Sequence, residues 1–126
     1  MYVYYNPNPL RRNTGDCVVR AISKLIGMSW DETFIRLSLM AYLKKDNLEK
    51  NHVWGDFLIR NGYRKRYVEH TCPYCINVRD FAATHPYGAY LLKLDSLIIG
   101  HVVTVIDGNY YDTDDSGDEI IEYYYE

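Results

Sequence analysis

Residues 101–112 read HVVTVIDGNYYD and carry the clearest structural signal in the chain. The first six residues are rich in β-branched side chains and alternate in character, which favours a strand. Asp107-Gly108-Asn109 is typical of a tight hairpin turn. Tyr110-Tyr111-Asp112 then begins the return strand. The sequence therefore predicts an antiparallel hairpin in which residues 101–106 and 110–113 are neighbouring strands.

The chain on both sides of this hairpin extends the predicted sheet. Residues 89–94 (AYLLKL) have the composition of a strand, and residues 120–125 form another after an acidic turn at 114–118. We therefore expect residues 87–126 to form an antiparallel sheet. Tyrosines at positions 2, 4, 5 and 123–125 flank the domain, and the sequence leaves open whether they pack over the core or form an aromatic surface.

The chain before residue 87 has a different character. Residues 1–15 are rich in Asn, Pro and Arg and are expected to form an irregular arm. Residues 16–86 are predicted to be mainly helical, because apolar positions recur with a helical period and Ser29 and Gly27 are typical helix boundaries. The predicted helices cover about 16–25, 29–44, 53–60 and 77–84, with one basic edge strand at 63–69. Helices followed by a sheet indicate a single α+β domain over residues 1–126.

Composition and charge exclude several classes of protein. The 126 residues have a net charge of -3, and eight of the 17 acidic residues lie in 107–126, a stretch without Lys or Arg. The basic cluster at 64–66 is too small a footprint for a nucleic-acid partner. The N-terminus lacks the pattern of a signal peptide. No apolar run is long enough to span a bilayer, so we expect no membrane partner. Three cysteines do not suit a disulfide framework, so we expect reduced thiols and a cytoplasmic location.

Cys17 and His101 are the most informative chemical pair. Cys17 stands at a predicted helix N-terminus, where the helix dipole and free amides favour a thiolate and can stabilise an oxyanion. A cysteine nucleophile needs a base, and the base needs a third group to orient it. Asp112 would lie close to His101 across the hairpin, although a slip in register would leave Asp114 or Asp115 in its place. The neighbouring Asp16 opposes a thiolate unless it caps the helix.

The segments 13–22 (NTGDCVVRAI), 100–103 (GHVV) and 111–113 (YDT) resemble the papain-like cysteine peptidase superfamily. The order of elements is similar to that of bacteriocin-processing, C39-like peptidases and to small uncharacterised papain-like proteins of phages and Firmicutes. The resemblance covers about residues 10–115. It implies a papain-like fold, with N-terminal helices packed on a C-terminal antiparallel sheet, and a phage or bacterial role.

The resemblance also implies roles for the three residues. Cys17 would be the nucleophile, His101 the general base and acid, and Asp112 the orienting residue of a catalytic triad. Such enzymes usually have a Gln a few residues before the nucleophile as an oxyanion donor. This sequence contains no Gln, and Asn13 is the nearest amide that could replace it.

Cys72-Pro73-Tyr74-Cys75 forms a CxxC turn that requires a separate interpretation. Zinc would need two further ligands, for which His70 and His85 are the nearest candidates and His52 a more distant one. No second CxxC is present, so we favour a turn with reduced, structural thiols and expect no metal.

The sequence thus predicts a thiol hydrolase, a cysteine peptidase or isopeptidase that acts on a peptide or protein substrate without a cofactor. The alternative is a catalytically inactive papain-like module that binds a protein partner, with the CxxC turn as a possible zinc knuckle.

Overall fold

The computed structural model describes residues 1–71, 73–95 and 100–126, so the expectation for Cys72 lies outside the described residues. Within these ranges the chain forms four helices and six strands, and the α+β class is confirmed. The elements in chain order are β1 (Tyr2–Tyr4), α1 (Cys17–Ile26), α2 (Trp30–Lys44), α3 (Asn51–Arg60), β2 (Lys65–Tyr67), α4 (Val78–Thr84), β3 (Ala89–Leu94), β4 (His101–Ile106), β5 (Asn109–Asp112) and β6 (Ile121–Tyr125).

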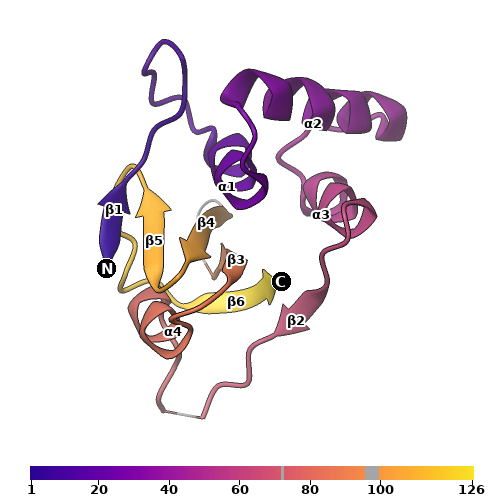
Figure 1. Ribbon diagram of the computed structural model, residues 1–126. Helices are drawn as coiled ribbons and strands as arrows, with labels where there is room; N and C mark the ends of the chain where they lie inside the picture. The colour runs from indigo at the N-terminus through magenta and orange to yellow at the C-terminus, as the bar shows by residue number, and fades with distance from the viewer. Residues whose placement is uncertain (72, 96–99) are drawn as a thin grey trace.

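All six strands belong to one sheet with the order β1-β5-β4-β3-β6-β2 (Figure 1). The expectation of a purely antiparallel sheet confined to residues 87–126 was wrong on two counts. β1 lies within the supposedly irregular arm and pairs in parallel with β5, so the sheet is mixed. The basic strand β2 pairs with β6, so the sheet extends beyond residues 87–126; β2 forms the opposite edge and is exposed, as its basic composition predicts.

The predicted hairpin is present and fixes the centre of the sheet. Ile106 pairs with Asn109 and Thr104 with Tyr111. The two intervening residues, Asp107 and Gly108, have φ values of 49° and 80°. Positive φ at both central positions is the signature of a type I′ turn, whose twist matches that of the flanking strands. The turn thereby places the end of β5 beside the beginning of β4.

Helices α1 and α2 begin and end at residues that the sequence marks. Gly27 ends α1 with a φ of 78°, a left-handed conformation that glycine adopts at low cost. The Ser29 hydroxyl accepts a hydrogen bond from the backbone N–H of Glu32 and caps α2. The reciprocal half of the capping box is not formed, because the Glu32 carboxylate pairs with Arg36 instead.

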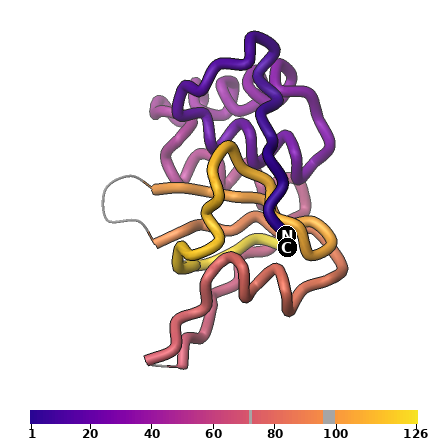
Figure 2. Tube along the Cα trace, turned by 90° about the vertical axis from the view of Figure 1, so that its left-hand side faces the viewer, coloured from indigo at the N-terminus to yellow at the C-terminus, as the bar shows by residue number. Residues whose placement is uncertain are grey.

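The sheet is covered on both faces, as Figures 1 and 2 show. Helices α1, α2 and α3 pack over one face in a cluster that includes Ile22, Leu37 and Leu91. Helix α4 covers the other face, where Phe81 packs with Leu92 and other side chains of the strands. Because alternate residues of β3 point into the two clusters, the central strands are held from both sides. This packing fixes the N-terminus of α1 against the sheet.

The C-terminal tyrosines pack into the core. Tyr123 and Tyr125 are 5% and 4% exposed, and the Tyr125 ring lies 5.7 Å from that of Trp54. At the other end of the chain, the Tyr2 ring lies 5.7 Å from that of Tyr110. The tyrosines at both ends of the chain therefore contribute aromatic packing across the sheet.

Candidate active site

Three elements meet where β4 begins and β5 ends. Cys17 is the first residue of α1, His101 the first of β4 and Asp112 the last of β5. The helix start, the hairpin turn and the packing of α1 on β4 together bring these residues into one site. Cys17 lies at a helix N-terminus, where the first backbone N–H groups have no acceptor within the helix.

His101 is fixed by Asp112. The imidazole Nε2 lies 2.6 Å from Asp112 Oδ2, and the Asp112 side chain is almost completely buried. The two other acids considered for this position lie elsewhere: Asp114 is exposed, and Asp115 accepts hydrogen bonds from the Tyr110 hydroxyl and the Gly117 N–H. Among the three acids, the structure therefore brings Asp112 to His101.

Cys17 contacts the same imidazole. Burial would raise the pKa of the Cys17 thiol, but the hydrogen bond and charge of His101, the Val102 N–H and the charge of Arg20 together lower that pKa below its ordinary value. Because His101 Nε2 is engaged by Asp112, the other ring nitrogen, Nδ1, is the one available to the sulfur. The imidazole thus lies between the thiol and the carboxylate.

The pKa values of His101 and Asp112 are shifted in the complementary directions. Burial would lower the pKa of His101, but its hydrogen bonds to Asp112 and Cys17 raise it to about 10. Burial would raise the pKa of Asp112, yet His101 and Arg20 hold it below its usual value. These directions favour a thiolate–imidazolium pair at neutral pH, the reactive form of a cysteine nucleophile.

Arg20 is a site residue that the sequence analysis missed. Its guanidinium is buried and pairs with Asp112 Oδ1 and Asp16 Oδ1, each at 3.0 Å. Asp112 also accepts hydrogen bonds from the Ser116 hydroxyl at 2.9 Å and the Thr113 N–H at 2.7 Å. Both carboxylate oxygens of Asp112 are therefore occupied, which fixes the side chain that orients His101. An arginine within the apolar run 18–22, four residues after an acid, is the signal that could have revealed it.

Asp16 does not cap α1, contrary to one expectation. The Asp16 side chain makes no capping hydrogen bond. Its Oδ2 instead accepts the indole N–H of Trp30 at 2.8 Å, while Oδ1 binds Arg20. The charge of Asp16 is thus compensated by Arg20 and not directed at the Cys17 thiol. A continuous chain of contacts runs from His101 through Asp112, Arg20 and Asp16 to Trp30.

Asn13, the side chain considered as an oxyanion donor, makes no hydrogen bond to Cys17 or His101 among the described residues. The Asn13 side chain is exposed on the loop before α1. Backbone N–H groups in the first turn of a helix have no acceptor within the helix. The Cys17 N–H is therefore the donor that the fold places beside the sulfur.

The described residues around the CxxC sequence make no contact with this site among the hydrogen bonds found. His70 Nδ1 accepts a hydrogen bond from the Ile76 N–H, and Nε2 lies 2.9 Å from the Ile121 carbonyl oxygen, so both ring nitrogens are engaged. His85 stacks on the Phe81 ring at 3.8 Å, and Cys75 is exposed. In residues 1–71, 73–95 and 100–126, no three His, Cys, Asp or Glu side chains form a group that could hold a metal.

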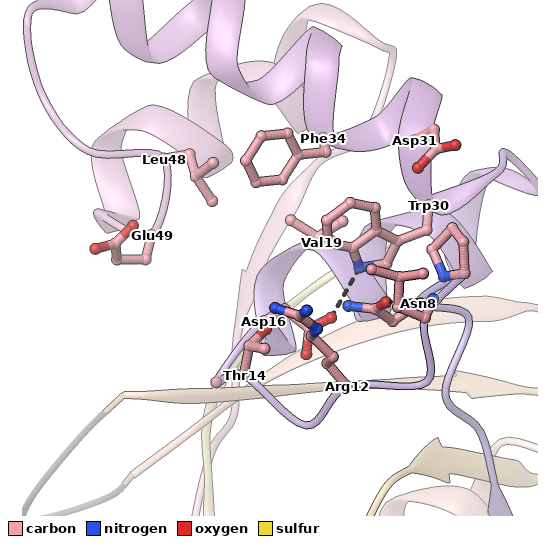
Figure 3. Close-up of a pocket in the computed structure, with 13 residues that line it drawn as sticks. Asn8, Arg12, Thr14, Asp16, Val19, Trp30, Asp31, Phe34, Leu48 and Glu49 are labelled. Atoms are coloured by element: carbon pink, nitrogen blue, oxygen red, sulfur yellow. Dashed lines mark hydrogen bonds between the residues drawn. The ribbon is translucent and has the colours of Figure 1, made fainter.

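A groove with a volume of about 610 Å³ opens beside the N-terminus of α1 (Figure 3). Gly15 and Asp16, the two residues before Cys17, form part of its lining. Trp30 and Phe34 of α2 form another part, and Leu48 a third. Phe34 is 40% exposed. Trp30 and Phe34 line the groove because α2 packs against α1 near Cys17.

No protein-family model matches this sequence, and neither the curated proteins nor the solved structures with which it was compared gave a match. The candidate site therefore rests on the contacts and distances among its own residues. Within the described part of the chain, no helix combines the length and apolar character that crossing a bilayer requires.

Proposed function

We propose that this chain is a thiol hydrolase with a papain-like arrangement of Cys17, His101 and Asp112. One observation carries the proposal: the His101 imidazole lies between the Cys17 thiol and the Asp112 carboxylate, with Nε2 2.6 Å from the acid. A nucleophile, a base and an orienting group in this order define nucleophilic catalysis at a carbonyl. The substrate class is a peptide or protein amide, and the setting is the cytoplasm of a bacterial or phage-infected cell.

The proposed reaction has two steps. In the first, the Cys17 sulfur attacks the carbonyl carbon, the C–N bond breaks, and His101 gives its proton to the departing amine. The product of this step is a thioester on Cys17. In the second, His101 takes a proton from water, the water oxygen attacks the thioester, and the acid leaves as the sulfur is restored. The Cys17 backbone N–H donates to the oxyanion that forms in both steps.

Arg20 and Asp112 act through His101. The buried guanidinium holds Asp112 in one orientation, and Asp112 holds the imidazole with Nδ1 toward the sulfur. An imidazole held by a carboxylate retains its proton more strongly, which stabilises the imidazolium needed in the first step. Arg20 is thus a positioning residue for the proposed reaction.

Acylation by p-nitrophenyl acetate tests the proposal without knowledge of the natural substrate. We expect the Cys17 sulfur to take the acetyl group with release of p-nitrophenolate, and water then to release acetate. Absorbance of p-nitrophenolate gives the rate, and the intact mass with peptide mapping gives the acylated residue.

The matched controls are Cys17→Ser and Cys75→Ser. Cys17→Ser should abolish the catalysed release, whereas Cys75→Ser should leave it unchanged because Cys75 is exposed and apart from the triad. Acetylation of Cys75 in place of Cys17 would refute the proposal. A stable acetyl-Cys17 that never turns over would favour the inactive binding module instead.

A further inference from the structure

The groove beside α1 has a predominantly apolar interior. Val19 lies behind the stacked rings of Trp30 and Phe34, whose centroids are 5.0 Å apart at an interplanar angle of 13°. The indole N–H of Trp30 is already satisfied by Asp16. The rings therefore offer apolar surface to an occupant and no unsatisfied donor, as Figure 3 shows for the Trp30–Asp16 contact.

Two exposed apolar side chains extend this surface. Leu10 of the N-terminal arm is 71% exposed, and Phe34 is 40% exposed. Leu48 lines the groove from the segment between α2 and α3. Apolar surface gathered in a concave site is typical of ligand binding, and the groove volume lies in the usual range for such sites.

The charges around the groove are of both signs. Arg12 lies on the side of the arm, whereas Asp31 and Glu49 lie on the α2 side and the opposite wall. Arg12 would repel a cationic occupant. Asp31 and Glu49 would repel an anionic one. Asp16 adds no free charge, because Arg20 neutralises it. The mixed charges therefore disfavour a charged side chain and favour a neutral one.

The position of the groove connects it to the reaction. Gly15 and Asp16 line it and directly precede Cys17 in the chain. Successive residues of an extended peptide advance by only about 3.3 Å. The groove therefore begins within one residue of Cys17 in the chain, and the side chains next to an attacked carbonyl are the parts of a peptide substrate closest to it.

We propose that this groove seats a large neutral apolar side chain, aromatic or leucine-like, next to the cleaved bond of a peptide substrate. This inference rests on the proposed function, since it concerns the substrate of the same nucleophile. It makes Trp30, Phe34 and Leu48 specificity-determining residues.

Two series of covalent probes test the inference on the full chain. N-acetyl-X chloromethyl ketones place residue X on the acyl side, and chloroacetyl-X amides place it on the leaving-group side, with X as Phe, Leu, Gly, Lys or Asp. In both series the Cys17 sulfur displaces chloride to form a thioether, which intact mass detects. We expect the Phe and Leu probes of at least one series to react about tenfold or more faster than the Gly, Lys and Asp probes.

Variants assign the preference to the groove. Phe34→Ala and Leu48→Ala should reduce the preference for apolar X several-fold, whereas Ile35→Ala should not, because Ile35 is exposed on the same helix and does not line the groove. Iodoacetamide, which has no side chain to seat, measures the Cys17 thiolate separately. Normal iodoacetamide reactivity without any preference for X would overturn the groove inference alone. An unreactive Cys17 in the native protein would overturn the proposed function.

Discussion

Arg20→Met is expected to lower the free energy of unfolding by roughly 3–5 kcal/mol. Arg20 is 3% exposed and pairs with two buried carboxylates, those of Asp16 and Asp112. Methionine has a similar length but no charge, so Asp16 would lose its cation and Asp112 would keep only His101. Removal of one partner from a buried ion pair is costly because the remaining charge stays unpaired. Urea unfolding of the variant and the parent protein measures the difference.

Arg36→Met is the matched control. Arg36 also pairs with a carboxylate, that of Glu32 one helical turn away, but both side chains are more than half exposed. We expect its replacement to cost no more than about 1 kcal/mol. An Arg20→Met loss as small as that of Arg36→Met would show that the buried pairs do not hold the site together. Asp16→Asn in the Arg20→Met background should recover part of the loss, since it removes one of the stranded charges.

His101→Ala is expected to lower the rate of Cys17 acylation by p-nitrophenyl acetate by about 10²–10⁴-fold, the usual range for loss of a general acid–base group. The imidazole lowers the pKa of the Cys17 thiol and supplies the proton of the first step. Without it, burial raises the pKa of the thiol, and only the Val102 N–H and the charge of Arg20 oppose that rise. Release of p-nitrophenolate under single-turnover conditions measures the effect.

His52→Ala is the control for this prediction. His52 lies 2.6 Å from an acid, Asp46, as His101 does from Asp112, but it is exposed on α3 and away from Cys17. Its replacement should leave the acylation rate unchanged. Equal rates for His101→Ala and the parent protein would mean that the imidazole does not activate the thiol.

The sequence predicted most of the elements that depend on local signals. The hairpin at 107–108 follows from a turn that needs positive φ, and Ser29 and Gly27 bound their helices through their own side chain and backbone. These features involve residues within a few positions of one another. Local signals also placed the three candidate residues: Cys17 at a helix start, and His101 and Asp112 on the two neighbouring strands of the hairpin.

Features that depend on distant contacts were missed. β1 is only three residues long, and its strand partner β5 lies more than 100 residues away, so its Tyr-Val-Tyr composition was too short a signal. Arg20 binds Asp112 of β5, which lies 92 residues further along the chain, so local signals do not reveal its pairing with the site. Trp30 and Phe34 lie four residues apart on α2, and the packing of α2 against α1 places them in the groove. Tertiary packing decided each case.

The pH dependence of Cys17 alkylation by iodoacetamide tests the central claim most directly, because only the thiolate reacts. With the pKa of Cys17 lowered and that of His101 raised to about 10, the thiolate should already be present at neutral pH. We predict that Cys17 reacts faster than Cys75 at pH 7, with a rate that rises at a lower pH than the ordinary thiol pKa. In His101→Ala the rise should move to alkaline pH. A rise at an ordinary thiol pKa in the parent protein, or a profile that His101→Ala leaves unchanged, would contradict the account.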